Sequence, residues 1–363
     1  MKYPIITNFI NGENITGGNN LLDVYNPQTG EIISKVPLSN SLSVDSAVAA
    51  AKEAFPGWSN LPIKERVQVF YKYKQLLERH KDELAALVSE ENGKTISESE
   101  AEVLKSVEVT EFACSLPQLT FGEILEVSNG VECRSEFSPL GVVACITPFN
   151  FPNMVPNWTL PNALVMGNTM VLKPSEQVPL SAMRLAELLK EAGLPDGVFN
   201  IVHGAQEVVE SICDHPDIQA VSFVGSTRVA KIVYKRSTAN LKRALALGGA
   251  KNHLIVLPDA NVEMTASNVA VSMSGCAGQR CMAASAMVAV GDVDHIIEKL
   301  CEEARNIIPG KNLGSVISAE AKLRIENYIN EAEAQGAKIL VDGRGAIVDG
   351  CEEGYYVGPT IID

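Results

Sequence analysis

Cys281 ends the run Ala277-Gly278-Gln279-Arg280-Cys281, which follows a helical stretch and lies between flexible residues. A thiol beside a fixed cation and exposed loop amides has its thiolate favoured, and the thiolate is the nucleophilic form of cysteine. Two other interpretations stay open: a small buried apolar residue, or a metal or redox pair with Cys276, five residues earlier. No histidine cluster or second cysteine pair nearby favours a metal or redox site.

Asn150 occurs in the run Thr147-Pro148-Phe149-Asn150-Phe151-Pro152, directly after a predicted buried strand. The two prolines restrict the backbone, and α/β folds bind their ligands at the carboxyl ends of sheet strands. The side-chain amide of Asn150 can therefore donate a hydrogen bond to a developing oxyanion. An asparagine that only satisfies a turn is the simpler alternative.

Two further short motifs also follow predicted strands. In Lys173-Pro174-Ser175-Glu176, the amine and the carboxylate can reach the ribose hydroxyls of a dinucleotide, and the carboxylate would repel a 2′-phosphate and so favour NAD over NADP. A solvated surface pair is the alternative. Gly225 and Ser226 open a predicted helix whose free amides suit a pyrophosphate, but no G-x-G-x-x-G motif accompanies them, and a simple serine cap explains them equally well.

The elements that position these residues alternate between strand and helix from residue 141 onward. This alternation predicts parallel βαβ units. The expected strands are 141–146, 169–173, 198–202, 220–224, 242–247, 253–257, 287–290 and 338–341, and the expected helices are 181–192, 206–213, 226–235, 262–273, 296–307 and 319–334.

The sequence predicts helices in the N-terminal part of the chain. Apolar spacing predicts a helix over 43–55 with Ser43 as its cap, a continuous helix over 62–91 that Gly93 ends, and a third over about 98–119. The segment 121–140 is rich in strand-forming residues and carries the turn signal Asn129-Gly130, which predicts a hairpin arm.

Composition narrows the class of protein. The chain has 363 residues, of which 46% are hydrophobic, and its formal net charge is −14. This disfavours disorder and general binding to nucleic acid or anionic membranes. No membrane-spanning run or signal-peptide pattern occurs, and the eight cysteines include no C-x-x-C pair, which indicates reduced thiols. We expect a cytoplasmic enzyme of roughly two or three domains.

The order and spacing of the motifs resemble the aldehyde dehydrogenase superfamily. The runs that carry the resemblance are 148–152, 173–176, 225–227, 247–249 and 278–281, and the likeness extends through essentially the whole chain. Within the superfamily, Gly249-Ala250-Lys251-Asn252-His253 and Gly278-Gln279-Arg280-Cys281-Met282 are similar to the CoA-acylating methylmalonate-semialdehyde dehydrogenase branch. The resemblance implies NAD-dependent oxidation of malonate or methylmalonate semialdehyde, with coenzyme A as the acyl acceptor.

The resemblance also assigns roles to matching positions. Cys281 would attack the aldehyde carbonyl, and Asn150 with the Cys281 N–H would hold the oxyanion. The residues that would contact NAD are Thr147 and Phe149, Lys173 and Glu176 at the adenine ribose, and Gly225 and Ser226 at the pyrophosphate.

Two positions bear on the acceptor and the substrate. Hydrolytic relatives carry a glutamate base 34 residues before the nucleophile, where this chain has Leu247, or Ala246 after a one-residue shift. Neither side chain can take a proton from water, so a thiol is a more suitable acceptor of the acyl group than water is. Of the two arginines that the branch uses against the substrate carboxylate, Arg280 matches one and Lys105 replaces the other, without its bidentate fork. Another short aldehyde is therefore an alternative substrate.

The implied fold is α/β, with a Rossmann-type NAD-binding domain at 1–120 and 141–250, a β-hairpin oligomerisation arm at 121–140, and an α/β catalytic domain at 251–363. Family members continue past Asp363, with a glutamate for the nicotinamide ribose and a strand that pairs with the arm. The resemblance thus implies a C-terminally truncated chain that forms a homo-oligomer when full length. An inactive paralogue that only binds nucleotide is a further alternative.

Overall fold

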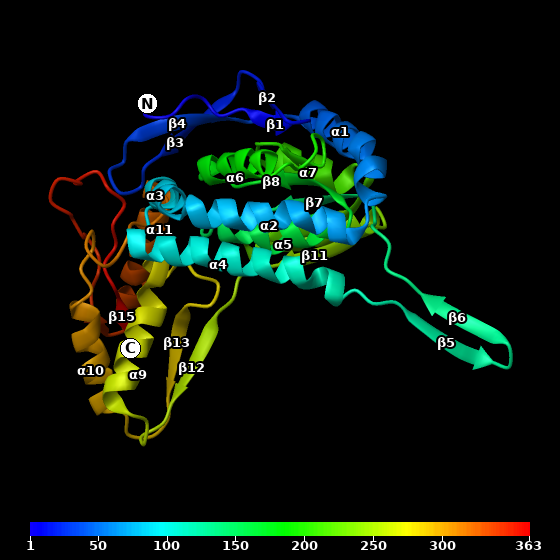
Figure 1. Cartoon of the computed structure of the whole chain (residues 1–363). Helices are drawn as coiled ribbons and strands as arrows, with labels where there is room; N and C mark the ends of the chain where they lie inside the picture. The colour runs from blue at the N-terminus through cyan, green and yellow to red at the C-terminus, as the bar shows by residue number, and fades with distance from the viewer.

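The computed structural model describes residues 1–363. Its centre is a seven-stranded sheet in the order β11-β10-β7-β8-β9-β1-β2 (Figure 1). The five strands from β11 to β9 are parallel, and β1 and β2 add an antiparallel edge. The strands are β1 (Asn8–Ile10), β2 (Glu13–Ile15), β7 (Val142–Ile146), β8 (Thr169–Lys173), β9 (Phe199–Ile201), β10 (Ile218–Val224) and β11 (Arg243–Leu247).

Helices cover both faces of this sheet, which is why β7 and β8 are buried along their whole length and β7 is apolar throughout. Alternate β7 residues enter two different cores: Val142 and Ala144 face α1, α7 and α8, whereas Val143 and Cys145 face α2, α4, α5 and α6. The helices are α1 (Ser41–Ser59), α2 (Ile63–Arg79), α3 (Lys81–Asn92), α4 (Ile96–Ser115), α5 (Met154–Val165), α6 (Pro179–Glu191), α7 (Gln206–Asp214) and α8 (Thr227–Ala239).

The α/β prediction is confirmed, and the N-terminal helices need three corrections. Asn40, not Ser43, caps α1, since its side chain accepts from the Ser43 N–H. The helix expected over 62–91 is two helices that meet at His80. Gly93 does end α3, with φ of 88°. The third helix begins earlier than expected, because Thr95 and Glu98 form a capping box.

A second group of elements follows β11. β12 (Asn252–Val256) and β13 (Ala284–Ala289) form a parallel pair against which α9 (Val262–Ser274) and α10 (Asp294–Arg305) pack (Figure 1). A short 3₁₀ helix (Gly275–Gly278), α11 (Ala319–Ala334), β14 (Ile339–Val341) and β15 (Ile361–Ile362) complete it. Cluster contacts among Val178, Val316 and Val357 join this part to the central sheet unit. The domain limits given above stay predictions.

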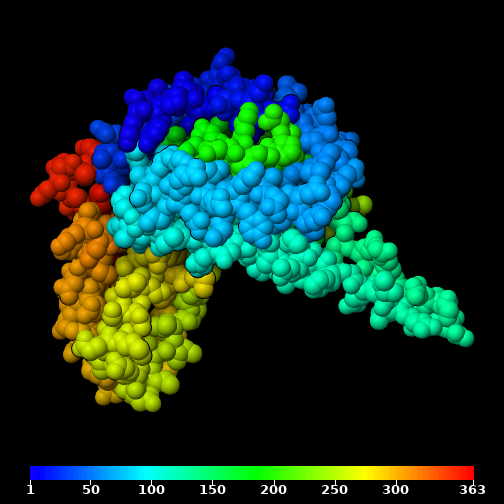
Figure 2. Space-filling view, viewed as in Figure 1, coloured from blue at the N-terminus to red at the C-terminus, as the bar shows by residue number.

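The segment expected to be an arm is a hairpin of β5 (Glu123–Ser128) and β6 (Val131–Ser135). Every residue of both strands is exposed, and the hairpin projects from the body of the protein (Figures 1 and 2). Gly130 turns it with φ of 73°, a conformation that favours glycine. Its part in oligomerisation stays a prediction.

Sequence patterns missed α5 and the N-terminal strands, which include β3 (Leu21–Tyr25) and β4 (Ile32–Pro37). α5 contains Pro161 and is apolar on most sides, so it lacks the amphipathic period by which a surface helix is recognised. Among the helices of the structure, none combines the length and the apolar character that crossing a bilayer requires.

Candidate active site

The expected cofactor residues gather at one edge of the central sheet. Ile146 at the end of β7 pairs with Lys173 of β8 and Phe223 of β10, so these strands end at the same level. The chain runs from β7 through β8 to β9 and then returns to β10 on the other side of β7. This reversal is a topological switch point, and doubly wound folds bind dinucleotides at the carboxyl ends of the strands at such a point. Thr147 and Gly225 follow these ends directly.

Lys173 and Glu176 form an ion pair with a separation of 2.8 Å between Nζ and Oε2. The lysine side chain is almost completely buried and the carboxylate is about one third exposed. The alternative of a freely solvated surface pair is therefore wrong. A carboxylate held in this way at a strand end suits a hydrogen bond to a ribose hydroxyl.

Gly225 and Ser226 begin α8, as expected. Ser226 is the N-cap and its hydroxyl accepts from the Val229 N–H at 3.4 Å. A Cβ at position 225 would lie 2.6 Å from the Phe223 ring, so this turn requires glycine. The N–H of Gly225 bonds to the carbonyl of Leu247 at 3.1 Å. The serine-cap interpretation is thus correct, and the same helix start also offers amides to an anion.

Asn150 lies against the loop that precedes Cys281, although 129 residues separate it from its partner there. Its Nδ2 donates to the carbonyl of Gln279 at 2.7 Å. Thr147 is buried and donates its N–H to the carbonyl of Lys173, and Phe149 packs against the cluster of Val178 and its neighbours. The fold therefore brings the predicted oxyanion donor and the predicted nucleophile loop together.

The loop around Cys281 is held by side chains that bond to its backbone. Asn252 Nδ2 donates to the carbonyls of Cys281 and Ala283, at 2.8 and 2.9 Å. Gln279 donates to the carbonyl of Cys276 and accepts from the Ile317 N–H, both at 3.1 Å. The Cys281 side chain itself is exposed. Backbone clamps with a free side chain are the arrangement that a positioned nucleophile needs.

The backbone between α9 and this loop turns through the left-handed region. Cys276, Ala277 and Gly278 have φ of 55°, 50° and 74°. Two of the three are not glycine, and such residues are rare there unless the surroundings hold them. Here Glu98 of α4 does so, because its Oε1 accepts the Cys276 N–H at 2.6 Å.

Cys276 differs from Cys281 in its surroundings. It is only 2% exposed, and burial raises the pKa of its thiol to about 11, although Lys94 opposes this shift. At neutral pH Cys276 is therefore a neutral thiol in the interior. This geometry favours Cys281 as the nucleophile of the two.

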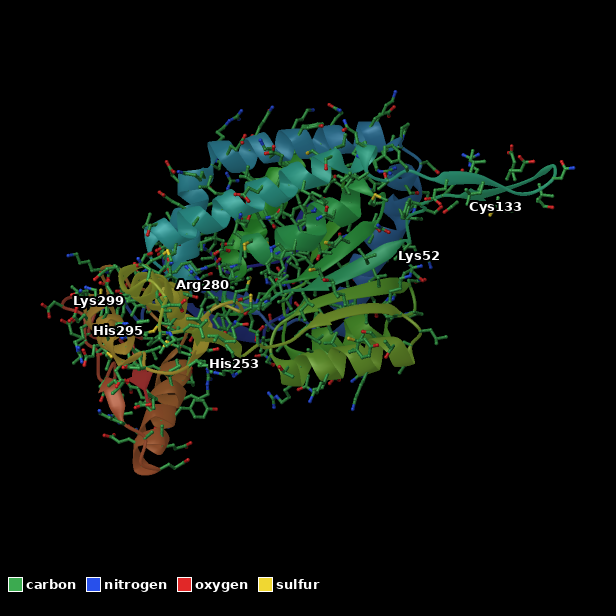
Figure 3. The ribbon with its side chains drawn as sticks, turned by 90° about the horizontal axis from the view of Figure 1, so that it is seen from below. Lys52, Cys133, His253, Arg280, His295 and Lys299 are labelled. Atoms are coloured by element: carbon green, nitrogen blue, oxygen red, sulfur yellow. The ribbon has the colours of Figure 1, made fainter.

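Arg280 is tied to α4. Its Nη2 donates to Oε1 of Glu98 at 3.1 Å, and a Cβ at position 275 would fall 2.2 Å from its guanidinium carbon (Figure 3). Lys105 lies two turns further along α4, where its amine pairs with Glu108 and makes no contact with Arg280 or Cys281. The structure thus places Arg280 beside the nucleophile but does not bring Lys105 to it.

No proton acceptor ends β11. Leu247 is 43% exposed, and Ala246 is partly buried against the core. The site also contains residues to which sequence reasoning gave no role: Asn252, Glu98 and Lys94. One signal was present, since Glu98 and Glu102 are four residues apart, so they share one face of α4.

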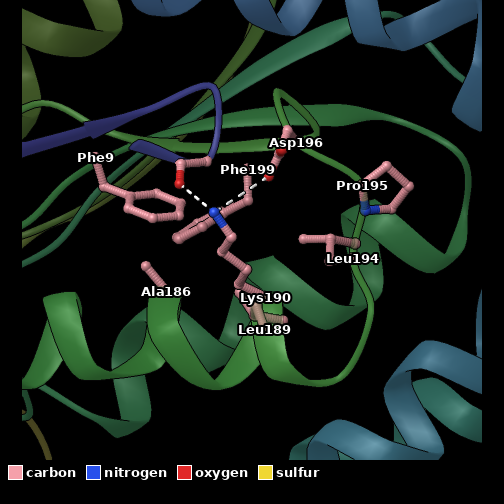
Figure 4. A pocket seen from close by; sticks show the side chains of 9 residues that line it. Phe9, Ala186, Leu189, Lys190, Leu194, Pro195, Asp196 and Phe199 are labelled. Atoms are coloured by element: carbon pink, nitrogen blue, oxygen red, sulfur yellow. Dashed lines mark hydrogen bonds and ion pairs between the residues drawn. The ribbon is translucent and has the colours of Figure 1, made fainter. Parts of the chain in front are cut away.

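The pocket in Figure 4 is a separate feature. Phe9, Gly12 and Asp196 line it, and Lys190 donates across it to the carbonyl of Gly12 at 2.6 Å. It holds about 10 Å³ of space, which is roughly one water molecule. It is too small for a dinucleotide and contains none of the residues discussed above.

Comparison with known proteins decides the family. Residues 15–363 match the model of the aldehyde dehydrogenase family. The chain belongs to the aldehyde dehydrogenase family. Among its relatives, malonate-semialdehyde dehydrogenase 2 of Geobacillus thermodenitrificans is 49% identical over 99% of the chain and 76% of the relative. Malonate-semialdehyde dehydrogenase of Pseudomonas aeruginosa is 43% identical over 98% of the chain and 73% of the relative.

Solved structures of family members have the same fold. Methylmalonate-semialdehyde dehydrogenase from Oceanimonas doudoroffii superposes with a TM-score of 0.97 at 44% identity, over 99% of this chain and 76% of that one. An aldehyde dehydrogenase of Bacillus cereus in complex with NAD⁺ gives 0.93 at 32% identity, over 99% and 74%. The enzyme class and the α/β architecture expected from the motifs are confirmed.

Proposed function

We propose that this protein oxidises malonate or methylmalonate semialdehyde with NAD, through a thioester on Cys281 that is transferred to coenzyme A. The observation that carries the proposal is the exposed, backbone-clamped Cys281 beside Asn150, with Arg280 adjacent and no carboxylate at the end of β11. The names of the relatives, malonate- and methylmalonate-semialdehyde dehydrogenase, support the substrate.

The covalent chemistry follows from the loop. The Cys281 thiolate attacks the carbonyl carbon, and the resulting oxyanion accepts hydrogen bonds from Asn150 Nδ2 and the Cys281 N–H. Asn150 exchanges its present acceptor, the carbonyl of Gln279, for this oxygen. When the C–O⁻ bond of the thiohemiacetal collapses to C=O, a hydride leaves the same carbon and a thioester remains on Cys281.

NAD supplies the hydride acceptor when it is bound. The residues at the sheet edge fit a dinucleotide: the Glu176 carboxylate and Lys173 amine at the end of β8 suit ribose hydroxyls, and the start of α8 at Ser226 suits the pyrophosphate. The complexes of family members with NAD⁺ support this choice. Thr147 and Phe149 follow β7 at the same edge of the sheet and would lie beside the cofactor.

Coenzyme A is proposed as the acceptor because the site lacks a base for water. A thiol of pKa about 8.5 supplies its own thiolate, which attacks the thioester carbonyl and releases the Cys281 thiolate. Leu247 and Ala246 can neither remove a proton from water nor orient it. Transfer to a thiol therefore requires no general base from this chain, whereas hydrolysis does.

A second candidate is oxidation of another short aldehyde. The pairing of Lys105 favours it, because this amine is engaged with Glu108, whereas Arg280 pairs with Glu98. A lysine is a point charge and does not hold a carboxylate in a bidentate manner. Saturation curves for malonate semialdehyde and for propanal distinguish the candidates.

The test of the proposed function measures both products. Protein incubated with malonate semialdehyde, NAD and CoA should form NADH and an acyl-CoA in equal amounts, followed by absorbance and mass spectrometry. Cys281→Ala should form neither. NADH without an acyl-CoA, or both products from the variant, would contradict the proposal. A preference for propanal over malonate semialdehyde would support the second candidate.

A further inference from the structure

A buried ion pair lies directly behind Asn150. Lys94 follows α3 and Glu102 belongs to α4, and Nζ and Oε2 are 2.6 Å apart. Their side chains are 1% and 0% exposed. Two charges withdrawn from water in this way persist only where their remaining polar atoms are also bonded. The other contacts of the pair therefore show what it holds in place.

Lys94 holds the backbone of Asn150. Its Nζ donates to the Asn150 carbonyl at 2.7 Å and lies 4.2 Å from the centroid of the Phe151 ring. The carbonyl has one other partner, the Cys276 thiol at 3.8 Å, which is a weak donor. Lys94 is thus the strong hydrogen-bond donor to this carbonyl.

Glu102 holds the other end of the same segment. Its Oε1 accepts from the backbone N–H groups of Asn153 and Met154, at 2.8 and 3.0 Å. Burial opposes the charged form of Lys94, but the pKa of the lysine is nevertheless raised, because the attraction of Glu102 and weaker contributions from neighbours such as Glu98 together exceed the effect of burial. Lys94 is therefore charged at neutral pH, and the ion pair bonds to the backbone at both ends of residues 150–154.

We propose that the Lys94–Glu102 pair is a positioning device for Asn150: it fixes the backbone of residues 150–154 so that the Asn150 amide points at the nucleophile loop. There the amide already donates to the carbonyl of Gln279, two residues before Cys281. Lys94 and Glu102 act through Asn150 and touch neither substrate nor cofactor. The inference rests on the proposed function, in which Asn150 stabilises the oxyanion.

A double-mutant cycle tests this dependence. Lys94→Met with Glu102→Gln removes both charges and keeps a carbonyl acceptor for Asn153 and Met154. This change is made in the natural protein and in Asn150→Ala, and the rate of the first NADH turnover with malonate semialdehyde is measured. Asn150→Ala alone should slow it about 10²–10³-fold, as loss of an oxyanion donor does.

The neutralised pair should slow the natural protein about 10–10²-fold, because a misplaced donor loses most of its effect. In the Asn150→Ala background the same change should slow the reaction less than about 2-fold, since the group that the pair positions is already absent. Equal losses in both backgrounds would overturn the positioning role. No loss from Asn150→Ala itself would instead overturn the oxyanion role in the proposed function.

Two further variants separate positioning from general stability. Lys242 is also a buried lysine, and its amine donates to the carbonyls of His215 and Ile218, away from the nucleophile loop. Lys242→Met should lower the melting temperature but leave the first-turnover rate within about 2-fold. If the double substitution folds poorly, Glu102→Gln alone gives a second cycle with the same expected non-additivity, and additivity there would overturn the inference equally.

Discussion

The edge of the central sheet and the loop around Cys281 are built by different physical means. At the sheet edge, Lys173 ends β8, and Thr147 and Gly225 directly follow the parallel strands β7 and β10, so strand register brings them level. In the loop, left-handed backbone and side-chain bonds from Glu98 and Asn252 hold each residue. The edge therefore tolerates change in its individual side chains better than the loop does.

The largest effect is expected at the nucleophile. Cys281→Ala should lower NADH formation at least about 10⁴-fold, because the covalent step is lost. Cys276→Ala should retain activity within about 10-fold, since its thiol is buried and neutral. Steady-state rates with NAD, CoA and malonate semialdehyde measure both. Greater loss from Cys276→Ala would reverse the assignment.

Thiol reactivity gives an independent check on the same residue. Cys133 is exposed on the arm, far from Arg280, and so controls for exposure alone (Figure 3). Iodoacetamide at neutral pH should label Cys281 about 10-fold faster than Cys133 and ahead of the six other cysteines, because only Cys281 combines an exposed side chain with the neighbouring Arg280 and loop amides. Equal rates by peptide mass spectrometry would remove the argument for activation.

The second largest effect is expected at the loop clamp. Asn252→Ala removes the donor to the carbonyls on both sides of the nucleophile and should lower kcat about 10²-fold. NAD affinity, measured by calorimetry, should change less than about 2-fold. If NAD affinity falls and kcat does not, the loop and the sheet edge are coupled and the comparison fails.

A smaller, complementary effect is expected at the sheet edge. Glu176→Gln removes the carboxylate that would repel a 2′-phosphate, so the preference for NAD over NADP should narrow about 10-fold, or about 1.4 kcal/mol. The rate of Cys281 alkylation should stay unchanged. A natural protein that prefers NADP would show that this carboxylate does not face the ribose.

The smallest effect concerns stability alone. Glu91 of α3 is buried and accepts the backbone N–H groups of Leu180 and Ser181 at the start of α6. Burial raises its pKa to about 7. The folded state therefore binds a proton that the unfolded chain has lost, and the stability from this group decreases as the pH rises from about 4.5 to about 7.

Glu91→Gln should remove that part of the pH dependence without changing the reaction rate. Melting temperatures of the two proteins are measured every half unit from pH 5 to pH 8. Above about pH 7, the two plots of melting temperature against pH should have the same slope. An unchanged slope in the variant between pH 5 and pH 7 would show that Glu91 does not carry the proton.

The sheet edge could be predicted from the sequence more fully than the loop around Cys281. The strand 142–146 was predictable because it is a continuous apolar run, and the strand 169–173 because Met170–Leu172 are apolar between polar ends; the order of polar residues at the strand ends follows from topology. Local motifs made Cys281 and Asn150 candidates, and the family resemblance assigned their roles. The break at His80 and the helix α5 were not predictable, since tertiary packing decides them.

The loop geometry was hidden for a different reason. Glu98 and Lys94 meet Arg280, Cys276 and Asn150 across more than fifty residues of chain, and such contacts leave no local pattern. The family resemblance puts Lys105 at the position of an arginine that binds the substrate, whereas only the fold shows that its amine pairs with Glu108 on the surface. Local periodicity predicts elements but not the side chains that connect them.

In the proposed function, the thioester on Cys281 passes to a thiol because no base at the end of β11 activates water. Stopped-flow absorbance of NADH with malonate semialdehyde, with and without CoA, tests it most directly. Without CoA, a burst should be followed by a steady rate about 10²–10⁴-fold lower than with CoA, and Leu247→Glu, at a partly exposed position, should raise that CoA-independent rate. Equal steady rates with and without CoA would contradict the account.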